Sequence, residues 1–398
     1  MPLLNAKDRL MIVDDEPKFC AFAKKAAAQL GFDAQCLTDS ARFLEVLRSF
    51  SPSVLMLDLK MPGRDGIQLL QNLKDDRCSA RIILVSGMDQ RTLNTAEKLA
   101  RSHGLAVSGV LQKPVRLAEL RSALQSAASN SGRYARADLG KAITADELVV
   151  HYQPKITYNN GRWAVCGAEA LVRWKHPTDG LVMPGEFLAI AEESNLIGSL
   201  TDFVIQTAVR QLSSWLKRGM DLNVAVNISA TSIDDLEFPD RLNKVLEDNE
   251  VPGSNLTLEL TESAAMADPS NAIDVFLRLR INDVVLAIDD FGTGFSSLKQ
   301  LYELPFDELK IDRAFVTELP GDVEARAIVR ATVDMAHALN MTVCAEGVET
   351  SGALEYLESV KCDRAQGYLI SRAVSAAEFE RLIGPWSDQA LHRAASRA

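Results

Sequence analysis

The sequence lacks the features that mark exported, membrane-spanning and disulfide-rich proteins. No window of about 18 apolar residues is free of charge, and Asp14, Asp15 and Glu16 interrupt the first apolar run, so neither a membrane span nor a signal peptide is expected. The six cysteines form no C-x-x-C pair, which argues against a zinc site or a disulfide framework. These absences favour a soluble, cytoplasmic protein with reduced thiols.

Positive charge is scarce in the second part of the chain. The 398 residues carry a net charge of −11; residues 1–128 contain 18 Lys/Arg and 14 Asp/Glu, and residues 129–398 contain 25 and 40. Because binding to a nucleic-acid duplex depends on Lys and Arg that neutralise phosphates, the second part is a poor candidate for DNA binding. If it takes a phosphate-containing ligand, metal ions must supply much of the positive charge.

A domain boundary is predicted near residue 130. Residues 125–134 are small, polar and rich in turn formers, and they follow an amphipathic helical pattern. We therefore assign residues 8–127 to a first domain, 128–142 to a linker and 143–390 to a second domain.

Both domains are predicted to be α/β. Before the boundary, apolar strand-like runs alternate with segments of helical period, which predicts a doubly wound parallel sheet. After it the alternation continues over about 250 residues, which is typical of a (β/α)₈ barrel. In both architectures, chemistry lies at the carboxyl ends of the strands.

Two adjacent carboxylates, Asp289 and Asp290, follow the apolar run 284–288 and precede a Gly/Ser loop. Alternate residues of a strand point to opposite faces, so both can point inward only if one already lies in the turn. A divalent cation would relieve their mutual repulsion. Alternatively, they simply end a strand and cap the next helix.

Polar side chains also follow the strands expected in the first domain, at Asp14, Asp15, Asp58, Ser86 and Lys113. The ends of these strands converge on one edge of a doubly wound sheet. Three carboxylates there would bind a hard cation such as Mg²⁺. A carboxylate beside Mg²⁺ and a lysine is equipped to attack a phosphoryl group.

This segment resembles a response-regulator receiver domain, which implies a flavodoxin-like fold. The matching motifs are D-D at 14–15, D-x-x-M-P-G-x-D-G at 58–66, S-G at 86–87 and K-P at 113–114. The resemblance implies that Asp58 is the phospho-acceptor and that Asp14 and Asp15 join it in holding one Mg²⁺ or Mn²⁺. It further implies Ser86 as the switch hydroxyl, Lys113 as the phosphate contact, and a cognate histidine kinase or phosphotransfer protein as a partner.

The expected strand ends of the second domain carry oxygen ligands. They are Glu169, Asn227, Glu259, Asp289, Asp290 and Glu346, with Lys310 and Gln366 nearby. All-oxygen ligands select Mg²⁺ or Mn²⁺ over zinc. Two such ions stabilise both the attacking and the leaving oxygen of an in-line displacement at phosphorus, so the implied reaction is phosphodiester hydrolysis. Each residue alone has a structural explanation, but their joint placement at strand ends favours a site.

The second domain resembles an EAL-type cyclic di-GMP phosphodiesterase. The motifs are Y-Q-P-K at 152–155, E-A-L-V-R-W at 169–174, F-L-A-I-A-E at 187–192, N-I-S at 227–229, E-L-T-E at 259–262, D-D-F-G-T-G at 289–294, L-K-I-D at 309–312, E-G-V-E at 346–349 and Q-G-Y at 366–368. No single motif compels the assignment, but nine in order do.

The resemblance implies a role for each matching residue. Glu169, Asn227, Glu259 and Asp289 would ligate one metal ion, and Asp290 the second. Glu346 would ligate metal or act as general base. Lys310 would orient the attacking water or stabilise developing charge.

Further roles implied by the resemblance concern the substrate and a loop. Gln153, Arg173 and Gln366 would contact cyclic di-GMP, and the arginine suits a phosphate oxygen by its fixed fork of donors. Glu262 would pin the Gly/Ser loop after Asp290, which in the family touches the dimer surface. A homodimer or higher oligomer is therefore expected.

Two positions depart from the family patterns. Val110 stands where many receivers carry an aromatic that reports the switch, and residues 371–373 read Ser-Arg-Ala where EAL domains usually have a basic residue followed by proline. At the second position we expect a local loop difference and retained activity.

Three functions compete. The favoured hypothesis is a response regulator, controlled by phosphorylation of Asp58, that hydrolyses cyclic di-GMP to linear pGpG. The alternative is a barrel that binds cyclic di-GMP without cutting it; such proteins usually lose a metal ligand or the lysine, whereas here every position is filled. A cyclase is excluded, because the chain contains no Gly-Gly pair and so no G-G-D/E-E-F loop.

Overall fold

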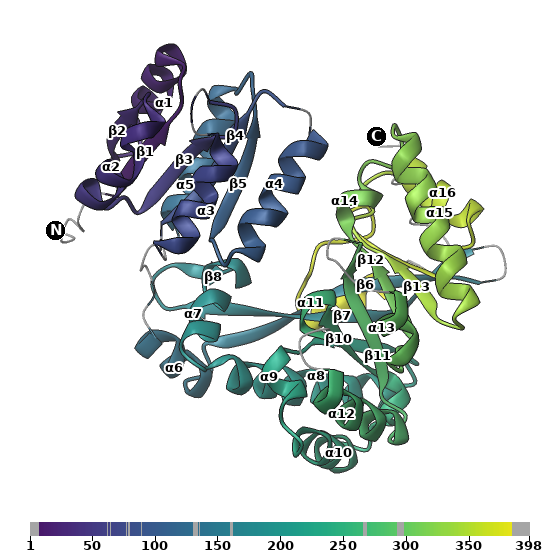
Figure 1. Cartoon of the computed structure of the whole chain (residues 1–398). Helices are drawn as coiled ribbons and strands as arrows, with labels where there is room; N and C mark the ends of the chain where they lie inside the picture. Colours follow the sequence, from purple (N-terminus) through teal and green to yellow (C-terminus); the bar gives the residue numbers. More distant parts are fainter. Residues whose placement is uncertain are drawn as a thin grey trace. The chain divides into compact units, whose positions relative to one another are not determined.

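The chain divides into two compact units, Met1–Arg133 and Tyr134–Ala398 (Figure 1). The computed structural model describes residues 8–61, 63, 65–76, 78, 80–88, 90–129, 134, 136–159, 162–265, 269–292 and 298–383. Across these ranges, no helix combines the length and the apolar character needed to cross a bilayer.

The first unit is a five-stranded parallel sheet in the order β2-β1-β3-β4-β5. Its strands are β1 (Arg9–Val13), β2 (Asp33–Leu37), β3 (Val54–Asp58), β4 (Arg81–Ser86) and β5 (Val107–Gln112). Its helices are α1 (Pro17–Gln29), α2 (Phe43–Phe50), α3 (Gly66–Asp75), α4 (Gln90–Ser102) and α5 (Leu117–Ser129), with a 3₁₀ turn at Ser40–Arg42. Two separate apolar cores accompany the sheet. The predicted doubly wound, flavodoxin-like sheet is confirmed.

Two local features determine the path of the chain between β3 and α3. Asp65 caps α3, since its side chain accepts a hydrogen bond from the Gln68 amide at 2.9 Å. Gly66 lies so close to the end of β3 that a Cβ there would stand 2.5 Å from Leu59 Cα and 2.6 Å from the Asp58 carbonyl oxygen. Only glycine fits this approach, which keeps the helix close to the end of the strand that carries Asp58.

The second unit is a closed barrel of eight strands. The hydrogen-bonded order is β6-β14-β13-β12-β11-β10-β9-β7-β8, and a β6–β7 pairing closes the ring with β8 outside it. The strands are β6 (Leu148–Asn159), β7 (Arg162–His176), β8 (Gly180–Val182), β9 (Asn223–Asn227), β10 (Leu256–Thr261), β11 (Val285–Phe291), β12 (Glu308–Ile311), β13 (Thr342–Ala345) and β14 (Arg364–Gln366).

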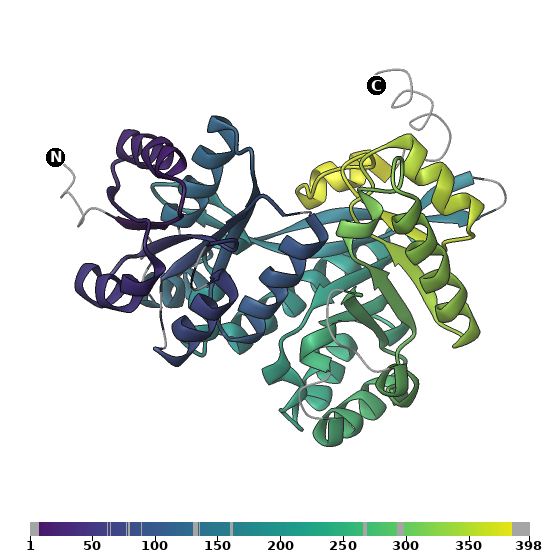
Figure 2. The ribbon, with the colours of Figure 1, turned by 45° about the horizontal axis from the view of Figure 1, so that its top comes forward.

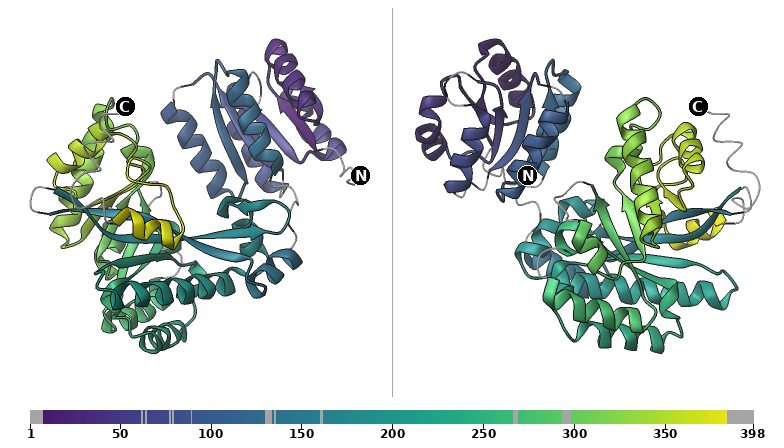
Figure 3. Two further views of the ribbon diagram at one scale, coloured as in Figure 1. Left: turned by 180° about the vertical axis from the view of Figure 1, so that it is seen from behind. Right: turned by 45° about the vertical axis from the view of Figure 1, so that its right-hand side comes forward.

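The barrel prediction is confirmed with one difference, which concerns β6. This strand runs antiparallel to both of its neighbours, β7 and β14, whereas a regular (β/α)₈ barrel has eight parallel strands. Only residues 160 and 161 separate β6 from β7, too few for the crossover that a parallel pair needs. The two strands form a long ribbon in Figure 3.

Helices surround the barrel (Figure 2). They are α6 (Arg136–Thr144), α7 (Leu188–Glu193), α8 (Ile197–Lys217), α9 (Ala230–Ile233), α10 (Phe238–Asp248), α11 (Glu262–Ala265), α12 (Pro269–Ile281), α13 (Leu298–Glu303), α14 (Arg313–Val316), α15 (Val323–Ala338), α16 (Ser351–Ser359) and α17 (Ala376–Ile383), with 3₁₀ turns at Pro184–Glu186 and Gly253–Asn255. The stretch 134–142, assigned above to the linker, contains most of α6. Tyr134, Leu139 and Ala142 are buried in the core of the second unit, because α6 packs as part of this domain.

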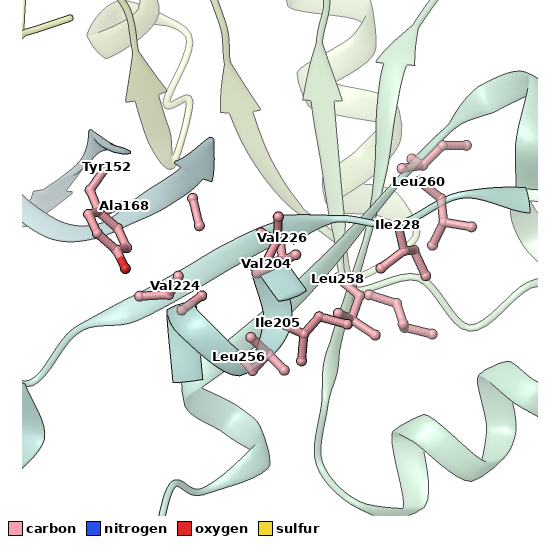
Figure 4. Close-up of a cluster of buried hydrophobic side chains, with 14 of the residues drawn as sticks. Tyr152, Ala168, Val204, Ile205, Val224, Val226, Ile228, Leu256, Leu258 and Leu260 are labelled. Atoms are coloured by element: carbon pink, nitrogen blue, oxygen red, sulfur yellow. The ribbon is translucent and has the colours of Figure 1, made fainter. Parts of the chain in front are cut away.

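Alternation along the strands separates the apolar layer from the polar interior. Figure 4 shows Leu256, Leu258 and Leu260 of β10 in one apolar cluster with Val204 and Ile205 of α8. Glu259 lies between two of these leucines in the sequence and therefore points to the opposite face of the strand, into the barrel. The same alternation places Glu308 and Lys310 of β12 opposite Leu309 and Ile311, which belong to the apolar core.

Candidate functional sites

Lys310 is the centre of the barrel's polar interior. Its ammonium nitrogen lies 2.7 Å from Glu259 Oε2, 3.1 Å from Asp289 Oδ2 and 2.6 Å from Glu346 Oε1. The side chain is completely buried. Burial lowers the pKa of Lys310, but the surrounding carboxylates outweigh it and raise the pKa well above its usual value. Lys310 is thus a fixed cation with its donors directed at three carboxylates.

Glu259 lies between two lysines. Lys155 Nζ is 2.6 Å from its Oε1, and Lys310 Nζ is 2.7 Å from its Oε2. Burial raises the pKa of Glu259, but the two ammonium groups outweigh it and hold the pKa at about 2. Glu259 is therefore ionised at neutral pH although it is fully buried.

Asp289 and Asp290 are separated by an irregularity in β11. The register between β11 and β12 shifts between Ile288 and Phe291, and Asp290 has a left-handed backbone with φ of 55°. This conformation is uncommon for a non-glycine residue. It resolves the alternation problem posed by the sequence, because both aspartates contribute oxygens to one cluster with Glu346, within 4.8 Å of one another.

Repulsion and burial raise the pKa values in this cluster. Burial raises the pKa of Glu346 to about 8, against the lowering effect of Lys310. Burial raises the pKa of Asp290 to about 6, helped by the charge of Asp289 and by a hydrogen bond with Asp312. A cluster that holds protons in this way can exchange them for a divalent cation.

Glu169 forms a second group with two amides. Asn227 Nδ2 donates to its Oε1 at 2.7 Å, and Gln366 Nε2 donates to its Oε2 at 2.5 Å. Burial raises the pKa of Glu169. Gln366 is buried, and its Oε1 has no hydrogen-bond partner within the described part of the chain, which leaves an acceptor for a cation or water.

These donors fit hard divalent cations. The carboxylates and amides described around Lys310 and Glu169 all offer oxygen, as Mg²⁺ and Mn²⁺ prefer. Three carboxylates lie close enough to share one ion, and Glu169 with Asn227 forms the neighbouring oxygen group. Glu259 has both oxygens engaged by lysines, so a metal ion there would compete with Lys310.

The predicted substrate contacts are partly engaged within the protein. Gln153 Nε2 donates to the Ser371 carbonyl at 3.2 Å, which anchors the Ser-Arg-Ala segment to β6. In the same segment, the Arg372 guanidinium stacks over the Tyr368 ring, 4.0 Å from its centroid. Arg173 donates to the Val172 carbonyl at 2.8 Å, and burial lowers its pKa. Gln366 contacts Glu169 as described above.

Glu262 contacts the backbone after β11, as the resemblance implied. The Gly292 amide donates to Glu262 Oε2 at 3.1 Å. The rest of the predicted Gly/Ser loop, residues 293–297, lies outside the described residues.

The first unit holds a second carboxylate cluster with a lysine. Lys113 Nζ lies 2.9 Å from Asp14 Oδ2, 2.7 Å from Glu16 Oε1 and 2.7 Å from Asp58 Oδ2. Burial lowers the pKa of Lys113, but its hydrogen bonds to the three carboxylates outweigh it and raise the pKa. Burial raises the pKa of Asp14. Lys113 therefore offsets part of the negative charge of the cluster.

The converging carboxylates differ from the predicted set in one position. Asp14, Glu16 and Asp58 bring oxygens within 4.8 Å of one another, and Asp15 is outside this group of described side chains. Asp14 and Glu16 are two residues apart just after β1, so they share a side that the intervening Asp15 does not.

Ser86 lies beside Lys113 of this cluster, whose backbone amide donates to the Ser86 carbonyl at 2.8 Å. Ser86, the last residue of β4, is fully buried, and its hydroxyl accepts a hydrogen bond from the Met88 amide at 3.3 Å. Val110 on β5 packs partly buried against the apolar core. Val110 therefore contributes to the apolar core at the position where many receivers carry the switch aromatic.

Sequence reasoning missed several charged neighbours of the sites. Lys155, Glu308 and Arg364 lie on strands of the barrel, and Glu308 pairs with Arg364. The sequence pattern that could have identified Glu308 is the presence of charged residues at alternate positions of an apolar strand, as at Glu308 and Lys310. Glu16 in the receiver cluster and Asp312, which forms a hydrogen bond with Asp290, are two further such neighbours.

Comparisons with known proteins agree with this architecture. The family model described as EAL domain matches residues 136–373, and the model described as Response regulator receiver domain matches residues 10–125. The chain therefore belongs to the EAL domain family and carries a receiver domain in its first unit.

Two curated relatives are named for cyclic di-GMP enzymes. The chain is 42% identical over 242 residues to bifunctional diguanylate cyclase/cyclic di-GMP phosphodiesterase MucR of Pseudomonas aeruginosa, covering 61% of this chain and 35% of MucR. It is 40% identical over 257 residues to cyclic di-GMP phosphodiesterase PdeR of Escherichia coli, covering 65% and 38%. The chain thus spans little more than a third of the length of these relatives.

A solved structure covers the barrel. The PaMucR phosphodiesterase in its c-di-GMP complex is 42% identical, with a TM-score of 0.58, and the match covers 61% of this chain and 98% of that chain.

Proposed function

We propose that the second unit hydrolyses cyclic di-GMP to linear pGpG by a two-metal mechanism, under control of phosphorylation at Asp58. The observation that carries the proposal is the convergence of Asp289, Asp290 and Glu346 beside the buried Lys310. Cyclic di-GMP is proposed as the substrate because the names of two relatives and the ligand in the PaMucR structure contain it.

The proposed metal ligands are those that the family resemblance implies, and they draw on both oxygen groups described above. Glu169, Asn227, Glu259 and Asp289 would hold one Mg²⁺ or Mn²⁺, and Asp290 the second. Bound ions would acidify the attacking water and stabilise charge on the transferring phosphoryl group.

Lys310 and Glu346 would handle the proton and the charge of the reaction. Lys310 is held rigidly in the site, so its ammonium can orient the water or stabilise an oxygen that gains negative charge. Glu346 has a pKa raised to about 8 by burial, which suits either a ligand that exchanges its proton for metal or a general base that accepts the proton of the water.

Substrate positioning would fall to side chains on β6, β7 and β14. Arg173 would donate to a phosphate oxygen in the bidentate geometry of its guanidinium. Gln153 and Gln366 would complete the contacts, at the cost of exchanging the internal hydrogen bonds that each makes in the free protein.

Control would begin with phosphorylation of Asp58 in the first unit. An Asp58 oxygen would attack the phosphorus of the donor, which is either a phosphorylated histidine of the kinase or a small-molecule phosphodonor. The new bond forms an acyl phosphate on Asp58 as the bond to the donor's leaving group breaks. Lys113 already contacts Asp58 Oδ2 and would contact the transferred group. Asp14, Asp15 and Asp58 remain the proposed ligands of one Mg²⁺ or Mn²⁺, with Glu16 as a further candidate.

The test is hydrolysis by the full chain. With Mg²⁺, purified protein should convert cyclic di-GMP to linear pGpG, measured by chromatography, and Glu169→Ala should abolish the conversion with an unchanged circular dichroism spectrum. Binding of cyclic di-GMP without any product would identify a receptor instead. Unchanged turnover in the variant would contradict the assignment of Glu169.

The remaining predictions concern assembly and location. We propose that the protein forms a homodimer or higher oligomer and receives its phosphoryl group from a cognate kinase or phosphotransfer protein. We also propose that it is cytoplasmic and binds neither DNA nor membrane. Light scattering of the purified chain tests the first of them.

A further inference from the structure

A chain of alternating charges crosses the interior of the barrel. Arg364, the first residue of β14, pairs with Glu308, the first residue of β12. Lys155 of β6 lies 3.5 Å from Glu308 Oε1 and 2.6 Å from Glu259 Oε1. Lys310 takes the other oxygen of Glu259. The chain therefore leads from the amino ends of the strands to the carboxylate site.

All of these charges except Arg364 are buried, where barrels of this class normally hold apolar layers. Glu259, Glu308 and Lys310 are 0% exposed, and Lys155 is 3% exposed. Buried ion pairs usually stabilise a protein no better than apolar side chains of the same volume, because both charges lose their hydration. Stability alone is therefore a poor explanation for Lys155.

The geometry around Glu259 supplies another explanation. Lys155 holds Oε1, so the carboxylate can present only Oε2 to Lys310 and the metal-binding group. Glu308 contacts Lys155 as its second carboxylate partner. Without Lys155, the Glu259 carboxylate would be free to rotate, and Lys310 would be its sole partner among the contacts described.

We propose that Lys155 is a positioning residue for the site, which fixes Glu259 in the orientation required to bind a divalent cation and to hold Lys310. Lys155 would act through Glu259 and not by direct contact with substrate or metal. The inference rests on the proposed function for its turnover readout, but its metal-binding readout needs no substrate.

The experiment is calorimetric titration of Mn²⁺ into the full chain, comparing wild type with Lys155→Met and Lys155→Arg. Residues that orient metal ligands typically contribute about 10- to 100-fold to metal affinity or activity, so Lys155→Met should raise the Kd for Mn²⁺ at least about tenfold. Lys155→Arg, which keeps the charge and donors, should recover most of the affinity. Lys175→Met, at an exposed position of β7, should leave the Kd unchanged.

The direction of the change separates positioning from charge balance. Removing a buried cation makes the site more negative, so electrostatics alone predicts tighter Mn²⁺ binding in Lys155→Met. Unchanged or tighter binding would overturn the proposal. A lowered Tm with unchanged Kd and kcat would also overturn it, because the role of Lys155 would then be structural.

A second variant covers the case in which Lys155→Met does not fold. Glu308→Gln keeps Lys155 and its contact with Glu259 but removes the negative charge on the other side. If Lys155 is held between two carboxylates, Glu308→Gln should weaken Mn²⁺ binding and lower kcat with little change in KM. Wild-type values in Glu308→Gln would then overturn the proposal.

The two readouts distinguish the two hypotheses. Wild-type protein that binds Mn²⁺ but makes no pGpG would contradict the proposed function and leave the inference on Lys155 standing on the Kd values. If wild type hydrolyses cyclic di-GMP but the Lys155 and Glu308 variants bind Mn²⁺ as wild type does, the proposed function would be supported and the inference on Lys155 contradicted.

Discussion

The Glu262 carboxylate accepts a hydrogen bond from the Gly292 backbone amide, with Oε2 3.1 Å from the nitrogen. Glu262 is buried at the start of α11, directly after β10, and Gly292 directly follows β11. Gly292 has φ of 94°, and a Cβ there would lie 3.0 Å from the Phe315 ring. The contact therefore fixes the chain two residues after Asp290, where the segment 293–297 begins.

Glu262→Ala should lower turnover, because it releases the backbone next to Asp290. We expect a loss of roughly tenfold, as for other residues that orient metal ligands, and a smaller loss in Glu262→Gln, which keeps an acceptor oxygen. Steady-state kinetics with cyclic di-GMP measures both. Glu355→Ala, at an exposed position of α16, is the control; turnover in Glu262→Ala equal to this control would contradict a role for the contact.

Lys310→Met should abolish most catalysis. Removing a donor that stabilises charge in a transition state typically costs about 100-fold or more in kcat, and Lys310 also forms ion pairs with three carboxylates. We expect at least this loss with Mg²⁺ at saturation, together with tighter Mn²⁺ binding, since a competing cation is gone. Lys244→Met on the exposed side of α10 should behave as wild type. A variant that retains full turnover would remove Lys310 from the mechanism.

The stability of the metal-free protein should fall as pH rises toward 8. Glu346 has a pKa of about 8 in the folded protein and about 4.3 when unfolded, so the folded state holds the extra proton between these values. The free energy of unfolding therefore decreases with rising pH across this window.

Denaturant unfolding in the presence of EDTA, repeated from about pH 5 to pH 8, measures the slope. Glu346→Gln cannot ionise, so the decline should be shallower in this variant than in wild type. Equal slopes would show that Glu346 does not carry the linkage.

Chelation and replacement of the metal should both stop hydrolysis. EDTA should remove turnover, and Mg²⁺ or Mn²⁺ should restore it. Ca²⁺ should inhibit, because its larger and more flexible coordination suits the near-octahedral Mg²⁺ geometry badly. Turnover supported by Ca²⁺ as well as by Mg²⁺ would argue against the two-metal mechanism.

Asp58→Asn should remove the response of the enzyme to phosphorylation. An amide cannot form the acyl phosphate, so turnover should be the same with and without a small phosphodonor. Asp75→Asn, on the exposed side of α3, is the matched control and should respond as wild type does. A response that persists in Asp58→Asn would place the acceptor elsewhere.

Local sequence patterns were sufficient to predict both folds and several of the side chains that converge in the barrel. The alternation of apolar strands and helices predicted the doubly wound sheet and the barrel, and both are confirmed. Polar residues at strand ends predicted which side chains would meet, since the ends of parallel strands share one edge. Lys310, Glu346, Asp289 and Asp290 do meet in the structure.

Tertiary structure decided what depends on partners distant in the sequence. β6 is antiparallel to β7 because only two residues separate them, and barrel closure then pairs β6 antiparallel with β14. The approach of Glu16 to Asp14 and Asp58 follows from how the chain leaves β1. The pairing of Lys155 with Glu259 joins positions 104 residues apart, and no pattern within β6 or β10 encodes it. The left-handed backbone of Asp290 is likewise set by the register between β11 and β12. A strand's own residues determine which face each side chain takes, but the partner it meets there depends on how the barrel closes.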